Sequence, residues 1–199
     1  DSGTIKSVDF VAYDNADGLA QILYTLKKYN VSGDFFVNGE FIRRYPLETR
    51  QIVNNNYNCN SMFFSQTDLT ENDFIIDEDF VRRGLARNED EFYQCTGKEL
   101  FLYWHAPFYK INQELIGYGE NAGYSYIDLK AENLEASGNN PFALIQEYYT
   151  RAVKNKGGII PVTVGYSQYK DSDYLYNYLD LLICALVDGG FELVGVNEL

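Results

Sequence analysis

The stretch Val8-Asp9-Phe10-Val11-Ala12-Tyr13-Asp14-Asn15-Ala16-Asp17 decides how the rest of the chain is interpreted. Its first half is short and rich in β-branched and aromatic residues, and it ends at a polar cluster, which predicts a buried strand. A helical apolar period begins directly afterwards, at Leu19. Polar residues that lie between such a strand and a helix occupy the carboxyl end of the strand, where α/β proteins usually carry their chemistry.

The same alternation of strand and helix continues to the end of the chain. Further strands are predicted at residues 33–37, 57–60, 100–104, 124–129, 159–164 and 191–196. Helices are predicted from residue 19 onward and at about 46–54, 77–97, 111–122, 142–154 and 171–187. Strict alternation with short connections predicts a parallel sheet, and seven repeats without a long insertion favour a barrel over an open sheet. We expect residues 1–199 to form one α/β domain.

Composition excludes several classes of protein. Of the 199 residues, 46% are hydrophobic and 16% aromatic, which indicates a folded chain rich in rings. The net charge of −13 argues against nucleic acid or an anionic membrane as a partner, since both require a cationic surface. No apolar run approaches the roughly 20 residues of a membrane span, so we expect no membrane insertion. The oligomeric state stays open.

The cysteines and the amino-terminal segment leave two questions open. Cys59, Cys95 and Cys184 are an odd number, so a disulfide framework is not implied. A bridge between Cys59 and Cys95 is one option in a secreted protein, and free buried thiols are the other. The chain begins with Asp and shows no basic segment before an apolar one, so a signal peptide was either trimmed or never present.

Two stretches resemble a known family. Residues 12–17 are similar to a degraded copy of the T-F-D-D-G-P motif, and residues 22–45 resemble the pattern L-K-K-Y-N-V-x-A-T-F-F-V-x-G. Both are typical of polysaccharide deacetylases, the NodB-homology or carbohydrate esterase family four proteins, which include the chitin deacetylases. The resemblance implies a distorted (β/α)7 TIM-like barrel. It also implies cleavage of an N-acetyl amide by water bound to a divalent metal such as zinc.

The residues at the metal positions of that family are mostly replaced. The first motif implies a catalytic base at Asp14 and a metal ligand at Asn15, where a neutral amide stands. The second motif, H-x-x-x-H, falls on Met62 and Gln66, whose thioether and amide are poor ligands for zinc. The whole chain contains a single His, so a site with two imidazoles cannot be assembled. We therefore predict that no metal cofactor is retained.

The remaining catalytic positions are also changed. His105 stands where the family has an Arg that pairs with the catalytic carboxylate. Either His105 hydrogen-bonds Asp14, or it is a strand-end His satisfied by backbone or water. Thr163 takes the place of the general-acid His, and a hydroxyl cannot usefully protonate a leaving amine near neutral pH. A Ser nucleophile of the G-x-S-x-G type is not present in the sequence either.

Aromatic residues at the predicted strand ends are the remaining sequence feature that points to a function. Aromatic side chains beside polar groups suit a sugar, whose apolar face stacks on a ring. The alternative is that most of them fill the core. The candidates are Tyr13, Trp104, Phe108, Tyr109 and Tyr166.

Three functions are compatible with this sequence. The first is a deacetylase-like protein without activity that binds or scaffolds chitin or another N-acetylglucosamine polymer, secreted or held at a cell surface or wall. The second is an active chitin or chitooligosaccharide deacetylase with a non-standard site. The third is a protein-interaction module without a sugar ligand.

Overall fold

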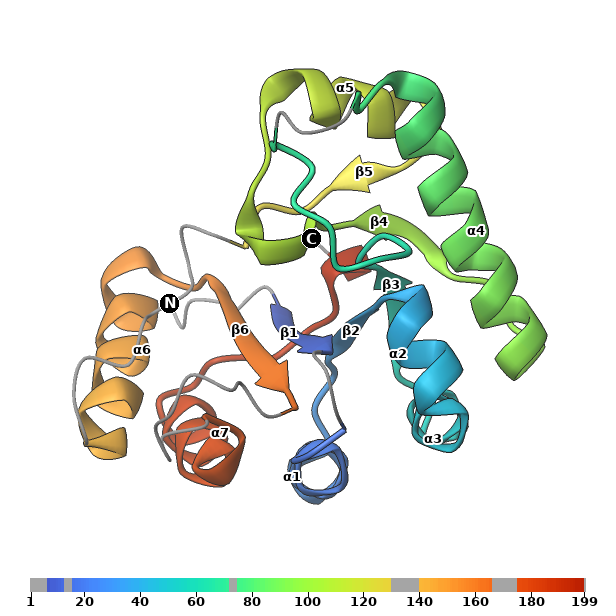
Figure 1. Ribbon diagram of the computed structural model, residues 1–199. Helices are drawn as coiled ribbons and strands as arrows, with labels where there is room; N and C mark the ends of the chain where they lie inside the picture. Colours follow the sequence, from blue (N-terminus) through green and yellow to red (C-terminus); the bar gives the residue numbers. More distant parts are fainter. Residues whose placement is uncertain (1–6, 13–15, 72–74, 130–139, 166–174, 199) are drawn as a thin grey trace. The chain divides into compact units, whose positions relative to one another are not determined.

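The computed structural model describes residues 7–12, 16–71, 75–129, 140–165 and 175–198, with the backbone alone for 7–12 (Figure 1). The chain divides into two compact units. One comprises Asp1–Asp34 with Glu132–Leu199, and the other is Phe35–Ala131. No helix in the described ranges combines the length and the apolar character that a membrane crossing requires.

The first unit is built on a parallel strand pair. Strand β1 (Ser7–Ala12) pairs with β6 (Ile159–Val164) along its whole length, from Ser7 opposite Ile159 to Ala12 opposite Val164. Its α-helices are α1 (Leu19–Tyr29), α6 (Pro141–Asn155) and α7 (Leu179–Asp188). The predicted strand that opens the chain and the parallel arrangement are thus both confirmed.

Gly18 sets the start of α1. It has a φ of 82°, and a Cβ added there would lie 2.5 Å from the ring of Tyr176. Helix α1 then buries Leu19, Ile22 and Leu26, which are three and four residues apart and therefore lie on one helix face. The fixed glycine and the apolar stripe together decide where the helix begins and which face it buries.

Within its described residues, the second unit contains four strands and four α-helices. Its strand order is β5-β4-β3-β2, with β3 parallel to β4 and β4 parallel to β5. The strands are β2 (Asp34–Val37), whose first residue belongs to the first unit, β3 (Asn58–Ser61), β4 (Phe101–Trp104) and β5 (Ser125–Tyr126). The helices are α2 (Gly39–Arg44), α3 (Pro46–Asn54), α4 (Glu78–Thr96) and α5 (Gln113–Asn121), with a 3-10 turn, η1, at Pro107–Tyr109.

Two predicted elements at the end of the chain are corrected. The strand expected over 191–196 is reduced to a single bridge residue at Leu193, followed by the 3-10 turn η3 (Val196–Glu198). There the Val196 N–H donates to the buried carboxylate of Asp34 at 2.6 Å instead of joining a ladder. The helix expected over 171–187 begins only at Leu179, after the 3-10 turn η2 (Leu175–Asn177), and residues 171–174 lie outside the described ranges.

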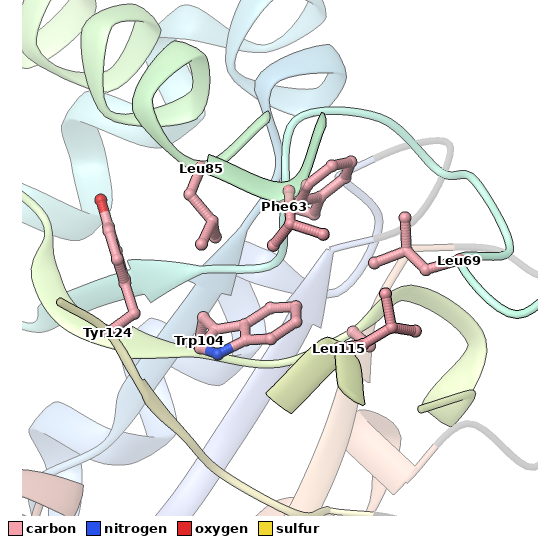
Figure 2. Packing of buried hydrophobic residues seen from close by; sticks show 8 residues of the cluster. Phe63, Leu69, Leu85, Trp104, Leu115 and Tyr124 are labelled. Carbon is pink, nitrogen blue, oxygen red and sulfur yellow. The ribbon is translucent and has the colours of Figure 1, made fainter. Parts of the chain in front are cut away.

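A cluster of buried apolar side chains forms the core of the second unit (Figure 2). It joins the loop after β3, helices α4 and α5, and the strand β4. Its members are Phe63, Leu69, Val81, Leu85, Trp104, Ala106, Leu115 and Tyr124. None of Cys59, Cys95 and Cys184 forms a disulfide, so the Cys59–Cys95 bridge that the sequence left open is absent.

One buried amide connects α4 to the sheet. The Asn88 Nδ2 donates to the Val37 carbonyl at 2.9 Å and to the Ser61 Oγ at 2.8 Å, and the side chain is fully buried. Asn88 therefore hydrogen-bonds the carboxyl ends of β2 and β3 at once. Its loss would remove one donor from the Val37 carbonyl and one from the Ser61 hydroxyl.

We predict that Asn88→Ala lowers the free energy of unfolding by about 1–3 kcal/mol, because it removes two buried hydrogen bonds that each contribute about 0.5–1.5 kcal/mol. Urea denaturation measures this, and the m-value should stay unchanged. Asp90→Ala on the exposed face of the same helix is the control and should stay within about 0.5 kcal/mol of wild type. Equal effects of the two substitutions would contradict a role for Asn88 in joining helix and sheet.

Candidate functional site

The predicted site residues fall in both units, and several lie outside the described residues. Tyr13, Asp14, Asn15 and Tyr166 belong to this group. In the first unit Thr163 is placed: it lies half-buried on β6, opposite Val11 of β1. The Gly165 N–H donates to the Asp17 carbonyl at 2.9 Å, so the segments that follow β6 and β1 are joined by a hydrogen bond.

The two positions of the second motif differ in exposure. Met62 directly follows β3, its backbone N–H donates to the Val37 carbonyl at 2.9 Å, and only 2% of the residue is exposed. Gln66 lies four residues further on and is half-buried. Met62 therefore behaves as a core residue.

A divalent metal does not fit the side chains found at these positions. Zinc is held by imidazole, thiolate or carboxylate, whereas Met62 and Gln66 offer a thioether and an amide. Across the described ranges, His, Cys, Asp and Glu side chains form no group of three that could hold an ion. Asp14 and Asn15 lie outside those ranges.

Asp68 organises the loop between β3 and α4. Its carboxylate accepts hydrogen bonds from the Thr70 backbone at 2.9 Å and the Thr70 Oγ1 at 2.6 Å, and it also pairs with Lys110. Burial acts to raise the pKa of Asp68, but the hydrogen bonds from Lys110 and Thr70 outweigh it and hold this pKa below its usual value. The ion pair joins the loop after β3 to the loop after β4. Sequence reasoning missed this contact, and no motif marks it.

His105 is enclosed by aromatic rings at the end of β4. Its ring centroid lies 6.1 Å from Phe36, 4.9 Å from Tyr109 and 6.2 Å from Tyr126, and only 1% of the residue is exposed. Among the described residues neither ring nitrogen has a hydrogen-bond partner of good geometry. The alternative of a His105–Asp14 hydrogen bond is not decided, because Asp14 lies outside those residues.

Burial sets the charge of His105. It lowers the pKa of the imidazole to about 3, against a weak opposing effect of the Ile127 backbone. The imidazole is therefore neutral at physiological pH. A neutral ring cannot replace the positive charge that a guanidinium would supply at this position.

The rings proposed for sugar binding differ in how far they are exposed. Trp104 is fully buried, and a Cβ added at Gly119 would lie 2.4 Å from its Nε1. Of the two alternatives that the sequence left open, Trp104 therefore fills the core and offers no exposed ring to a sugar. Phe108 is 44% exposed and Tyr109 is half-buried. Both have a φ of 57° in the turn that Pro107 begins, a left-handed conformation that costs non-glycine residues about 1–2 kcal/mol each. Of the candidate rings within the described residues, Phe108 and Tyr109 are the two that keep exposed surface.

Comparison with known proteins identifies the family of this chain. Residues 6–127 match the polysaccharide deacetylase family, so the chain belongs to that family. The peptidoglycan-N-acetylmuramic acid deacetylase PdaA of Bacillus subtilis is 27% identical over 142 residues, which cover 65% of this chain and 52% of PdaA. The chain thus spans about half the length of the curated relatives it matches.

Solved structures share the fold of the whole chain. The CE4 family pseudoenzyme BA3943 of Bacillus anthracis matches with a TM-score of 0.74 at 18% identity, over 98% of this chain and 65% of that one. A BA3943 mutant with restored enzymatic activity matches with a TM-score of 0.77 at 17% identity, over 99% of this chain and 67% of the mutant. Peptidoglycan deacetylase PdaC of Bacillus subtilis follows with a TM-score of 0.69 at 19% identity, over 98% of this chain and 89% of PdaC. The chain therefore has the (β/α)7 fold of this family, as the sequence predicts.

We predict that His105 stays neutral in the folded protein down to about pH 4. Since its folded pKa lies below the unfolded value near 6.5, only the unfolded chain gains a proton between these values, and acid destabilises the fold. The stability that His105 contributes is complete above about pH 6.5 and should fall by roughly 2 kcal/mol between pH 7 and pH 5.

The single imidazole gives one NMR signal, which reports the folded pKa directly. Denaturation of wild type and His105→Phe at both pH values isolates the contribution of the imidazole, because the carboxylates are common to the two proteins. A signal that titrates near pH 6.5, or an identical acid sensitivity of the two proteins, would contradict the buried neutral state.

Proposed function

We propose that this protein is a deacetylase-family member that binds an N-acetylated glycan and does not hydrolyse it. The observation that carries the proposal is the histidine count. The chain has one His, at position 105, and it is buried and neutral. The two-imidazole metal site of the family therefore cannot be assembled.

The residues at the other catalytic positions support the same conclusion. Thr163 takes the general-acid position, and its hydroxyl does not release a proton near neutral pH. Neutral His105 takes the position of the Arg that supports the base. Asp14 alone keeps the family residue, and a carboxylate without an activated water supplies only one part of the reaction.

Glycan binding needs fewer groups than hydrolysis does. Phe108 and Tyr109 offer ring surface, and a pyranose can stack on such rings while its hydroxyls meet polar groups. Asp14, Asn15, Tyr13 and Tyr166 are further candidates on sequence grounds. PdaA is named for action on peptidoglycan, which supports an N-acetylated wall or coat polymer as the ligand and a place outside the cell.

The rival hypothesis is an active deacetylase with a non-standard site. The BA3943 mutant with restored activity favours keeping it, because a pseudoenzyme of this fold can regain catalysis. Metal content and acetate release separate this hypothesis from the first.

We predict that the purified protein holds no stoichiometric divalent metal and releases no acetate from chitooligosaccharides above background. A neutral amide, a thioether and a second amide replace the ligands, and losing even one imidazole costs orders of magnitude in affinity. Elemental analysis after incubation with zinc, and an acetate assay on the same sample, measure the two quantities. About one zinc per chain that is lost on Asn15→Ala, or acetate release that depends on Asp14, would establish the active enzyme instead.

We also predict weak binding of N-acetylglucosamine oligomers that depends on the Tyr109 ring. Amide chemical shifts followed during a titration should respond at millimolar oligomer, and changes in salt should have little effect because no ion pair is involved. Tyr109→Ala should abolish the response and Tyr109→Phe should retain it. Tyr93→Ala, which removes a ring that is 56% exposed on α4, is the control and should change nothing.

The interaction module becomes the better explanation if the oligomers cause no response at millimolar concentration. It also becomes the better explanation if Tyr109→Ala leaves the response intact. Fully deacetylated oligomers of the same length test whether the acetyl group contributes, and they should bind more weakly.

A further inference from the structure

The second unit carries a groove of about 430 Å³ between α4 and the loop that follows β3. We call it the α4 groove, and it is lined chiefly by Phe63, Phe64, Phe80, Arg83, Gly84 and Arg87. Phe63 and Phe64 lie between Met62 and Gln66, the two replaced ligand positions. The volume falls in the range of small-molecule sites, which begins at about 300 Å³.

The floor of the α4 groove is apolar and closely fitted. The Phe63 ring stacks on Phe80 with a centroid distance of 5.9 Å and an interplanar angle of 29°. A Cβ added at Gly84 would lie 2.1 Å from the Phe63 ring, so the ring lies against bare helix backbone. Phe63 also has a φ of 64°, a strained conformation for a phenylalanine, and such strain is enriched at ligand sites.

Two arginines on successive turns of α4 border this floor. Arg83 and Arg87 are four residues apart, so their side chains are neighbours on the helix surface. The Arg87 guanidinium lies 3.9 Å from the centroid of the Phe64 ring. Like charges at this spacing disfavour one another by about 0.2–0.5 kcal/mol, which an anion between them would reverse.

The nearby carboxylates are engaged by arginines other than Arg87. Asp79 pairs with Arg82 and with Arg83, and Glu91 pairs with Arg43. Within the described ranges Arg87 forms no ion pair. Its charge acts on Glu91 through space and helps to lower the pKa of that carboxyl, whose direct partner is Arg43. A guanidinium without a direct carboxylate partner thus borders an apolar floor in a chain whose net charge is −13.

We propose that the α4 groove binds a carboxylate carried on a flat apolar group, such as an aromatic acid. The planar fork of a guanidinium matches the two oxygens of a carboxylate, and stacking on Phe64 orients the Arg87 fork in advance. The half-buried ring of Phe80, held in place by stacking on the buried Phe63, accepts the apolar part of the ligand. This site does not depend on glycan binding at the strand ends.

The test is a titration of the whole chain with benzoate, benzamide and acetate, followed by backbone amide shifts. Benzoate should shift the amides of residues 63–65 and 83–87 with a millimolar dissociation constant, which should increase with salt concentration. Benzamide has the same shape without the charge, and acetate has the charge without the ring. Both should bind at least about tenfold more weakly than benzoate.

Two variants that each lose one positive charge show whether benzoate contacts Arg87. Arg87→Gln should weaken benzoate binding by at least about tenfold. Arg82→Gln lies on the same helix outside the groove and should leave benzoate binding unchanged. Comparable losses in both variants would show a general charge effect and overturn the proposal.

Three further results would overturn it. They are no shift with benzoate at about 20 mM, equal binding of benzamide, or equal binding of acetate. Oligosaccharide titration of Arg87→Gln separates the two proposals, because sugar binding at Tyr109 should remain intact in that variant.

Discussion

Burial of the end of β4 is the constraint on which the second unit depends. Trp104 is the last residue of β4 and His105 follows it directly, and neither is more than 1% exposed. The indole packs against the backbone at Gly119, while the imidazole lies among the rings of Phe36, Tyr109 and Tyr126. A strand end that is filled in this way places rings where a polar reaction centre would need charged groups. The charge state of His105 follows from the same packing.

Much of the fold could be predicted from local patterns. Helix α1 follows from an apolar stripe behind Gly18, and α4 follows from a long amphipathic period that begins at an acidic cap, Asp77. The short helix α2 was missed because Phe41 and Ile42 follow β2 closely and resemble a continuing strand. The available signal was Asn38, whose side chain accepts a hydrogen bond from the Phe41 N–H.

What could not be predicted depends on partners that are distant in sequence. The stretch 191–196 has a strand-like pattern, yet its conformation depends on the buried carboxylate of Asp34. Trp104 at a strand end looks the same in sequence whether it is exposed or buried, and the space for it is created by Gly119 on α5. The same holds for the candidate site. The assignment of Met62 and Gln66 to ligand positions rests on residue types and stays a prediction, whereas the Asp68–Lys110 pair and the enclosure of His105 required the structure.

The packing of Met62 shows why the residue at this expected ligand position affects the core as well as the site. A ligand imidazole must keep one nitrogen directed at the metal. A methionine side chain, in contrast, stabilises the folded protein by about 1.5–3 kcal/mol when it is buried. Met62 is buried, and Phe63 and Phe64 beside it contribute to the core and to the α4 groove. Histidine at position 62 would bring a polar ring into that packing, and burying an unpaired polar group costs about 1–3 kcal/mol. Recovering a metal site here would therefore require repacking around the loop after β3, since packing and coordination demand opposite properties of the same side chain.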